Sequence, residues 1–426
     1  MPHLQFLPIA LDQASLRWLR LSPRPALIPC LPDGPQARPE VESLQSYSAP
    51  LEGRRGLLRL DFNENTVGPS PRVVEAIRAI PADRYAIYPE YDGLREAVVA
   101  NLSATTPGLA RSLAPEQVGL FNGVDAAIHA LFQAYGAAGD RLLTTSPTFG
   151  YYTPCARMQG MAIEAIPYEA PSFTFPLAGI GAALQPPAAG DAAGDTDGNE
   201  AQASWTPPRI LLLCNPNNPT GTRLAPERIL ELAALAPHTL VVVDELYEAF
   251  TGDSVLPLLL QASGAADPFA AHPNLLVLRS LAKTAGLAGL RIGFAIGPAA
   301  VVDRVSRVTG PYDINSFAVT AAHAALADQP YVEAYVAEVL RARDWLVQRL
   351  QEAGVHHHVD GGNYLLIWPK GDAGVVEAEL RRAGILVRSM AGKPLIDGSL
   401  RVSLGTLDQM QCFWAAYAAI ELSASP

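Results

Sequence analysis

The residue with the most distinctive chemical setting in this chain of 426 residues is Lys283, in the stretch RSLAKTAGLAGLRIG. An apolar run at 275–278 predicts a strand just before it, so the lysine follows a strand's carboxyl end, where α/β sheets bind ligands. Its neighbours are mostly apolar. Desolvation lowers the pKa of a lysine and favours the free amine that Schiff-base chemistry requires. The alternative is an ordinary surface lysine after a strand.

Three other segments place polar groups after predicted strands. LVVVDE contains Asp244, whose carboxylate can pair with a protonated pyridine nitrogen or simply cap the next turn. CNPNNPTG contains Asn218, which can donate to a phenolic oxygen or belong to an ordinary Asn-Pro turn. Gly123 follows a strand at 118–121 and opens a helix, whose backbone amides either bind a phosphate or are merely capped. Each segment is a weak signal alone, but their order at successive strand ends is a strong one.

Such segments need a sheet to bring them together. Runs such as ILLLC and LVVVD are apolar throughout, as expected of parallel strands buried on both faces, and they alternate with helical patterns. The sequence therefore predicts an α/β large domain at 56–310 with a mostly parallel central sheet. From 311 to 426, long helical patterns and strands at 364–368, 385–388 and 400–404 predict a smaller α+β domain.

Two segments fall outside this pattern. Residues 1–55 are rich in proline and are interpreted as an N-terminal extension or arm. Residues 186–204 are rich in Gly, Ala, Pro and Asp without an apolar period, which predicts a flexible surface insertion in the large domain.

Composition argues against several classes of function. A formal net charge of -11 argues against nucleic-acid binding, which usually shows as a basic domain. No apolar run reaches the roughly 20 residues that span a bilayer, so no membrane association is expected. The four cysteines form no CxxC pair, which indicates neither a zinc site nor a redox motif and favours a reducing, cytoplasmic location. We expect no metal at the three histidines 356–358, which are interpreted as a solvated loop.

Several motifs together carry a family resemblance. They are NEN followed by GPSP, YPE, NNPTG, VVVDELY, RSLAKTAGLAGLRIG and LRVSLGT, and they extend from residue 60 to residue 406. The set resembles the fold-type I pyridoxal-phosphate enzymes, namely the class I/II aminotransferases, and most of all their histidinol-phosphate aminotransferase branch. The resemblance implies a homodimer with shared active sites.

The resemblance also implies a role for each matching residue. Pyridoxal 5′-phosphate is the implied cofactor, Lys283 binds it covalently, and Asp244 pairs with the pyridine nitrogen. Tyr247 completes the implied catalytic set and, with Asn218, is implied to contact the ring oxygen of the cofactor. The other implied cofactor contacts are Gly123, Val124, Phe149, Asn218, Ser280, Arg291 and Tyr88, the last reaching the phosphate from the partner subunit. The implied substrate contacts are Asn65, Asn363, Arg388 for a distal phosphate and Arg401 for an α-carboxylate.

Departures from the family pattern concern the substrate more than the cofactor. Thr66 replaces the usual proline, Val67 an aromatic residue, Ala282 a serine and Phe149 a tyrosine. The predicted function is amino-group transfer between an amino acid, or histidinol phosphate, and a 2-oxo acid such as 2-oxoglutarate. One alternative is a decarboxylase or lyase on the same scaffold, similar to threonine-phosphate decarboxylase. Another is a non-catalytic regulator, although residues 1–55 show no helix-turn-helix pattern.

Overall fold

The computed structural model describes residues 34–44, 52–187, 205–262, 264 and 266–422. The chain divides into two compact units, Met1–Ser43 and Leu44–Pro426. The first contains the short helix α1 (Pro39–Glu42), and the second contains all the elements considered below. Most of the predicted extension at 1–55 and of the predicted insertion at 186–204 lies outside the described residues.

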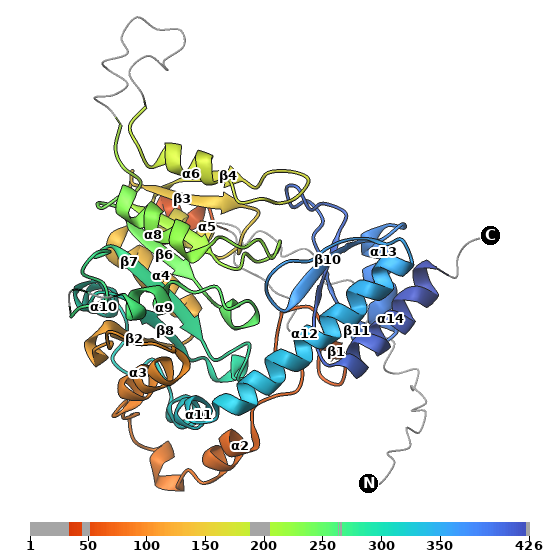
Figure 1. The fold of residues 1–426 in the computed structure, drawn as a ribbon, viewed down its shortest axis with the longest axis horizontal. Helices are drawn as coiled ribbons and strands as arrows, with labels where there is room; N and C mark the ends of the chain where they lie inside the picture. Colours follow the sequence, from red (N-terminus) through yellow and green to blue (C-terminus); the bar gives the residue numbers. More distant parts are fainter. Residues whose placement is uncertain (1–33, 45–51, 188–204, 263, 265, 423–426) are drawn as a thin grey trace, which may run out of the picture. The chain divides into compact units, whose positions relative to one another are not determined.

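A seven-stranded sheet is the centre of the large layer in the described part of the chain (Figure 1). Its strand order is β2-β8-β7-β6-β5-β3-β4, and β8 runs in the opposite direction to the other strands of this sheet. The mostly parallel sheet predicted from the sequence is therefore confirmed. The strands are β2 (Val118–Phe121), β3 (Arg141–Ser146), β4 (Ala162–Pro167), β5 (Ile210–Cys214), β6 (Leu240–Asp244), β7 (Leu275–Ser280) and β8 (Gly293–Ile296).

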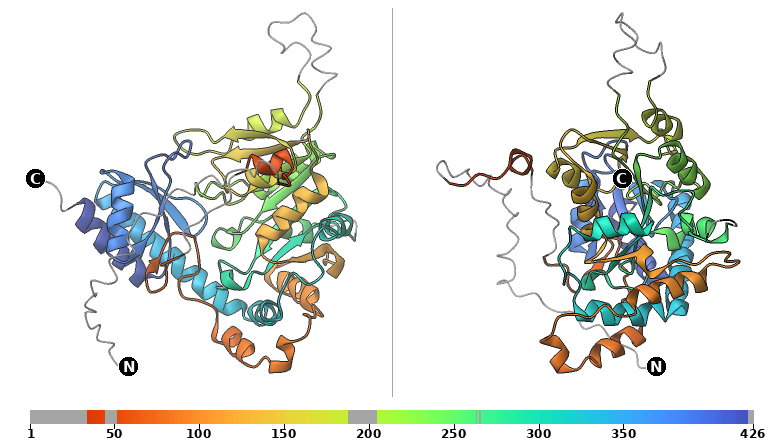
Figure 2. Two further views of the ribbon diagram at one scale, coloured as in Figure 1. Left: turned by 180° about the vertical axis from the view of Figure 1, so that it is seen from behind. Right: turned by 90° about the vertical axis from the view of Figure 1, so that its left-hand side faces the viewer.

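Helices cover both faces of this sheet, as Figures 1 and 2 show. All residues of β5 and β6 are buried, and successive side chains alternate between two cores. Leu211 and Val241 belong to one core, whereas Leu212 and Val242 belong to the other. The first core is completed by α2 (Pro71–Arg78), α3 (Leu94–Thr105), α6 (Leu177–Ala183), α8 (Pro226–Leu235), α9 (Val255–Gln261) and α11 (Ser316–Leu326). The second is completed by α4 (Val124–Tyr135), α5 (Tyr152–Met158) and α10 (Ala299–Ser306).

A smaller layer follows in the C-terminal part of the chain. Its antiparallel sheet has the order β12-β13-β10-β9, and β1 pairs in parallel with β11 beside it. The strands are β1 (Leu58–Arg59), β9 (His356–His358), β10 (Tyr364–Trp368), β11 (Ile385–Leu386), β12 (Arg388–Ser389) and β13 (Leu400–Ser403). The helices are α12 (Gln329–Glu352), α13 (Ala373–Arg382) and α14 (Leu407–Glu421). These helices and strands share a separate apolar core, as expected for an α+β domain.

The boundary between the large and small layers can be followed in the apolar cores to which the connecting segments belong. Helix α11 packs in a core of the large sheet, whereas α12 contributes Tyr335 and Val339 to the small core. Leu60, just after β1, also belongs to the small core, because β1 pairs with β11. The domain limits at 56–310 and 311–426 stay a prediction.

Side-chain caps begin several of these helices at residues of the expected type. The Thr406 hydroxyl accepts from the N–H of Gln409, whose own side chain accepts from the Thr406 N–H, and this capping box begins α14. The side chain of Asn315 caps α11, and Ser70, followed by a proline at the first helical position, caps α2. Local sequence therefore sets where these helices start.

The prediction of a solvated loop at 356–358 is wrong. These histidines form β9, an edge strand paired with β10. The ring of His356 stacks on Trp368 at 4.4 Å, and that of His358 meets Phe173 edge-on at 4.6 Å. The aromatic contacts supply the packing that makes a strand here. Across the described residues, no group of three or more histidine, cysteine or acidic side chains is arranged to hold a metal ion.

The structure also bears on membrane association. Among the described residues, every helix is too short or too polar to cross a bilayer. The cytoplasmic location expected from the sequence stays a prediction.

Candidate functional site

The polar segments identified in the sequence meet at one edge of the large sheet. Strands β5, β6 and β7 are parallel neighbours, and Asp244 is paired with Cys214 on one side and with Leu278 on the other. The loops that contain Asn218, Tyr247 and Lys283 therefore leave the sheet at the same level. This is the edge where α/β sheets bind ligands.

Lys283 is half-buried, and its amine points inward. Its Nζ donates to the carbonyl oxygen of Phe62 at 2.9 Å. Burial and, next, the positive charge of Arg401 lower its pKa to about 8, against the opposing charges of Glu64 and Asp125. At pH 7.5 about a quarter of such a lysine is the free amine, compared with about one part in a thousand for an exposed lysine. Lys283 is therefore suited to act as a nucleophile and a base.

Asp244 is a buried carboxylate at the end of β6. The hydroxyl of Tyr152 donates to its Oδ2 at 2.6 Å, and the N–H of Leu246 donates to its Oδ1 at 3.2 Å. Burial raises its pKa to about 6, although both hydrogen bonds act in the opposite direction. A buried acid with this pKa is mostly ionised near pH 7.5 and would be stabilised further by a cationic partner. This setting suits the predicted pairing with a pyridine nitrogen.

A hydrogen-bonded cluster surrounds the hydroxyl of Tyr247. The amide nitrogens of Asn63 and Asn218 donate to this oxygen, at 3.1 Å and 3.4 Å. Arg401 donates to the Oδ1 of Asn218 at 2.7 Å and to the carbonyl of Asp61 at 2.6 Å. The structure thus brings together Tyr247, Asn218 and Arg401, three residues predicted from separate motifs.

The expected phosphate end of the site lies at the start of α4. Gly123 precedes the helix with φ of 79°, and a Cβ there would lie 2.5 Å from Nη2 of Arg291. Only glycine allows the guanidinium to approach the helix terminus so closely. Arg291 also pairs with Asp125 at 2.9 Å. A helix N-terminus beside a guanidinium fits a phosphate group, and Val124 is the first residue of that helix.

Ser280 and Phe149 have mainly structural contacts. The Ser280 hydroxyl donates to the carbonyl of Ile292 at 3.1 Å and accepts from the N–H of Ala282 at 3.1 Å. Phe149 is partly buried and meets the ring of Tyr152 edge-on at 5.4 Å. Because Tyr152 bonds to Asp244, Phe149 lies close to the predicted pyridine site. The expected cofactor contacts of both residues stay predictions.

The two asparagines expected to line the substrate pocket differ in their surroundings. Asn65 uses its amide on the backbone: its Nδ2 donates to Thr284 at 2.9 Å, and its Oδ1 accepts from the N–H groups of Val67 and Gly68. Asn363 is fully buried and donates to the carbonyl of Asn63 at 3.2 Å. Its Oδ1 meets no donor within the described parts of the chain. That buried acceptor is therefore available to a ligand.

The two predicted substrate arginines face each other across neighbouring strands. Arg388 in β12 is the register partner of Arg401 in β13, which puts both side chains on one face of the small sheet. The guanidinium of Arg388 lies 5.5 Å from the ring centre of Phe62, whose carbonyl accepts from Lys283. Both arginines thus lie on the side of the small sheet that adjoins the lysine.

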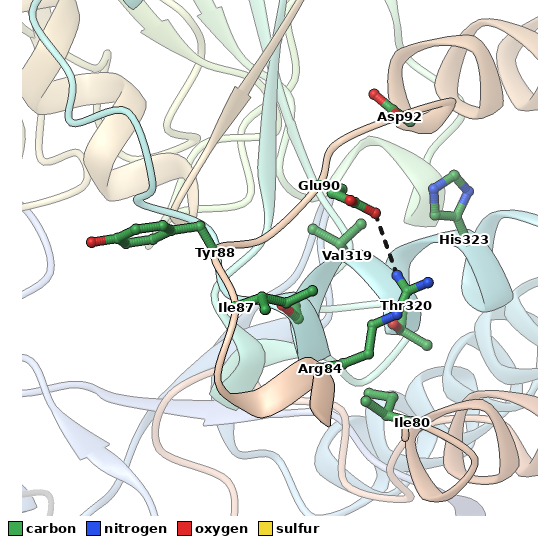
Figure 3. A pocket seen from close by; sticks show the side chains of 10 residues that line it. Ile80, Arg84, Ile87, Tyr88, Glu90, Asp92, Val319, Thr320 and His323 are labelled. Carbon is green, nitrogen blue, oxygen red and sulfur yellow. Dashed lines mark hydrogen bonds and ion pairs between the residues drawn. The ribbon is translucent and has the colours of Figure 1, made fainter. Parts of the chain in front are cut away.

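Tyr88 lies on the surface, away from this cluster. Its side chain is 71% exposed, and its ring stacks on Tyr312 at 4.0 Å. Tyr88 is one of the residues that line a small pocket together with Arg84, Glu90 and His323, and in Figure 3 its ring points away from those three side chains. The contact of Tyr88 with the cofactor phosphate stays a prediction.

Several residues of the site were not predicted from the sequence. Tyr152 bonds to Asp244, Asn63 bonds to Tyr247, and Ser403 holds Asn63. Arg54, in the segment interpreted as an extension, forms ion pairs with Asp61 and Glu64 and covers the ring of Phe62 at 4.4 Å. Asn63 and Ser403 lie inside the NEN and LRVSLGT motifs, which was a usable signal. Arg54 and Tyr152 carry no comparable motif.

Comparisons with known proteins bear on this arrangement. Residues 55–416 match the family model described as aminotransferase class I and II. The chain is 33% identical over 393 residues to a histidinol-phosphate aminotransferase of Roseiflexus castenholzii, covering 87% of this chain and 94% of that protein. It is 32% identical over 378 residues to histidinol-phosphate aminotransferase 1 of Bradyrhizobium diazoefficiens, covering 87% and 95%. Its fold resembles the structure of histidinol-phosphate aminotransferase from Sinorhizobium meliloti in complex with pyridoxal-5′-phosphate, with a TM-score of 0.74 and 23% identity, covering 93% of this chain and 100% of that chain.

Proposed function

Because the chain belongs to the aminotransferase class I and II family, we propose that its amino donor is a phosphorylated amine of the histidinol phosphate type and its acceptor a 2-oxo acid such as 2-oxoglutarate. The chain is a pyridoxal-phosphate-dependent aminotransferase, so the predicted family, fold, cofactor and reaction class are confirmed. The alternatives of a decarboxylase, a lyase or a regulator are not favoured. The proposed identity of the substrates is argued from two arginines on neighbouring strands of the small sheet.

The pairing of Arg388 with Arg401 carries the substrate proposal. Like charges that face each other across a strand pair repel, which is unfavourable unless an anion lies between or beside them. A guanidinium suits bidentate binding of a phosphate or a carboxylate. Arg388 is assigned to the distal phosphate of the donor, and Arg401 to the α-carboxylate of the amino-acid product formed from the 2-oxo acid. The names of the relatives support the phosphate assignment.

The residues of the large sheet are assigned to the cofactor. When bound, pyridoxal phosphate supplies an electron sink for negative charge that develops on the substrate carbon. Asp244, oriented by Tyr152, would accept a hydrogen bond from the protonated pyridine nitrogen, and its negative charge would keep that nitrogen cationic. Gly123, Val124, Ser280 and Arg291 would hold the phosphate, and Phe149 would cover the ring. Tyr247 and Asn218 would contact the ring oxygen. The buried carboxylate and the close approach of Gly123 to Arg291 support this placement.

Lys283 is assigned the proton transfers. Its pKa of about 8 leaves a free amine near neutral pH, as a general base requires. The carbonyl of Phe62 and the charge of Glu64 hold the amine in place between transfers. The Nζ of Lys283 would accept the proton from the substrate carbon and hold it for its return to the adjacent reacting atom. Asn65 and Asn363 shape the adjacent pocket.

Separate half-reactions test the substrate assignment. In Arg388→Ala, the half-reaction with histidinol phosphate should lose about 10- to 100-fold in kcat/KM, as expected for a lost charge-assisted pair. The half-reaction with glutamate should change little. Arg401→Ala should lower kcat/KM for glutamate more than for histidinol phosphate, and some loss with both is expected because Arg401 also holds Asn218 and acts on Lys283. Both half-reactions are followed by the change in cofactor absorbance, and release of a keto product without carbon dioxide identifies transamination.

A matched control is Arg382→Ala, an exposed arginine on α13 that should leave both half-reactions unchanged. Equal and small effects of Arg388→Ala on both substrates would remove the phosphate assignment. The donor would then be a general or aromatic amino acid.

A homodimer with shared sites is the second part of the proposal. Tyr85, Ile87, Tyr88 and Tyr312 are all exposed aromatic or aliphatic side chains, and Tyr88 stacks on Tyr312. Exposed apolar clusters of this kind mark interaction surfaces. The occupant assigned to this cluster is a second copy of the chain, with Tyr88 of the partner subunit at the cofactor phosphate.

Subunit mixing tests this assignment. Tyr88→Ala and Lys283→Ala should each be weakly active or inactive, but their mixed dimer contains one site with an intact lysine and an intact tyrosine. Co-expression should therefore give markedly more activity than the sum of the separate variants. The control pair, Asp244→Asn with Lys283→Ala, should give no such gain, because both changes lie in the same site as the lysine. An equal result for the two pairs would rule out a shared site.

A further inference from the structure

Asn63 is held in one orientation beside Tyr247. Its backbone N–H donates to the hydroxyl of Ser403 at 2.9 Å, and that hydroxyl donates back to Oδ1 of Asn63 at 2.9 Å. The hydroxyl thus accepts from the backbone of Asn63 and gives its single proton to the amide oxygen of the same residue. The amide nitrogen of Asn63 faces the other way and donates to the hydroxyl oxygen of Tyr247 at 3.1 Å.

Asn218 is oriented by the same reasoning. Arg401 can only donate, so its bond of 2.7 Å identifies the facing atom of Asn218 as the amide oxygen. The nitrogen of that amide is 3.4 Å from the Tyr247 hydroxyl. Arg401 and Ser403 are two residues apart on β13 and share one face of the strand. One strand thus aims two amide donors at one phenol oxygen.

The state of Tyr247 follows from these contacts. Burial is the largest influence on the pKa of Tyr247 and raises it above the ordinary value. Cys214 and Asp244 raise this pKa further, whereas Arg401 and the hydrogen bond from Asn63 lower it. The hydroxyl therefore keeps its proton at neutral pH. Because its oxygen receives N–H donors on both sides, the one interaction left to the group is donation of its own proton.

We propose that Asn63, held by Ser403, is a positioning residue that fixes Tyr247 as a hydrogen-bond donor to the anionic ring oxygen of the bound cofactor. The inference rests on the proposed placement of Tyr247 beside that oxygen. Asn63 supplies the shorter of the two N–H bonds to the Tyr247 oxygen, at 3.1 Å compared with 3.4 Å from Asn218. The left-handed backbone of Asn63, with φ of 53°, is part of this arrangement and allows glycine as a substitute.

The pH titration of the visible absorption band of the holoenzyme tests the proposal. A ring oxygen that loses a donor is less stabilised as an anion, so the neighbouring nitrogen that joins the cofactor to Lys283 holds its proton more tightly. Asn63→Gly should therefore raise the midpoint of the titration by about one pH unit, a tenfold change in the proton equilibrium. Ser403→Ala should raise it by less, because the amide is retained but free to rotate. Asn315→Gly, which removes a remote helix cap, should leave the midpoint unchanged.

A double variant separates positioning from general damage. Tyr247→Phe alone should raise the midpoint, and adding Asn63→Gly to it should cause no further rise, because Asn63 acts through the hydroxyl. An unchanged midpoint in Asn63→Gly, or an equal rise in both backgrounds, would overturn the inference. If Tyr247→Phe itself leaves the midpoint unchanged, the proposed placement of Tyr247 fails instead.

Discussion

Lys283→Ala should abolish turnover while the protein still folds and binds pyridoxal phosphate. The amine is the only group near Phe62 and Arg401 that is assigned both the attachment of the cofactor and the proton transfers, so its loss removes two steps at once. Rates should fall by about 10⁴-fold or more, since nucleophilic and general-base contributions are both removed. The fold should persist because the side chain is half-buried and makes one hydrogen bond, to a backbone carbonyl.

The measurement combines kinetics with labelling. Borohydride reduction of the wild-type holoenzyme should fix the cofactor on the peptide that contains Lys283, as identified by mass spectrometry. The variant should take no such label. Lys393→Ala, an exposed lysine after β12, is the matched control and should remain fully labelled and active. Labelling of any other lysine in the wild type would show that the cofactor-binding residue has been misassigned.

Asp244→Asn should retain the cofactor but lose about 10³-fold in kcat, as expected when a preorganised charge is removed from the reacting system. A neutral amide no longer keeps the pyridine nitrogen cationic, so the electron sink is weakened. Burial of Asp244 makes the effect large, because little solvent is available to substitute for the lost charge.

Tyr152→Phe provides the comparison for Asp244→Asn. It removes the hydroxyl that donates to Asp244 at 2.6 Å but leaves the carboxylate, so a loss of about tenfold is expected. Cofactor content is measured by absorbance in all variants, and single-turnover rates are compared at saturating cofactor. Near-normal turnover of Asp244→Asn would mean that the carboxylate does not control the pyridine nitrogen.

The sequence by itself determined the large sheet and the residues at its strand ends. Apolar runs such as ILLLC and LVVVD are typical of central strands of a parallel sheet, and both are buried throughout. Once those strands are adjacent, the positions of Asp244 and Lys283 follow, because each lies directly after its strand. The short-range signals at Thr406 and Ser70 likewise predict helix starts from neighbouring residues alone.

Only the tertiary structure decided how these residues are oriented. Tyr152 and Asp244 are 92 residues apart, and Asn63 and Ser403 are 340 apart, so no local spacing relates them. Their hydrogen bonds exist because β6 meets α5 in one layer and because the segment after β1 lies against β13 in the other. The same holds for β9, where contacts with Trp368 and Phe173 make a strand of three polar histidines. Local sequence preferences determine which segments form helices and strands. The partners of a buried polar side chain depend instead on which distant donors and acceptors the packing brings within hydrogen-bonding distance.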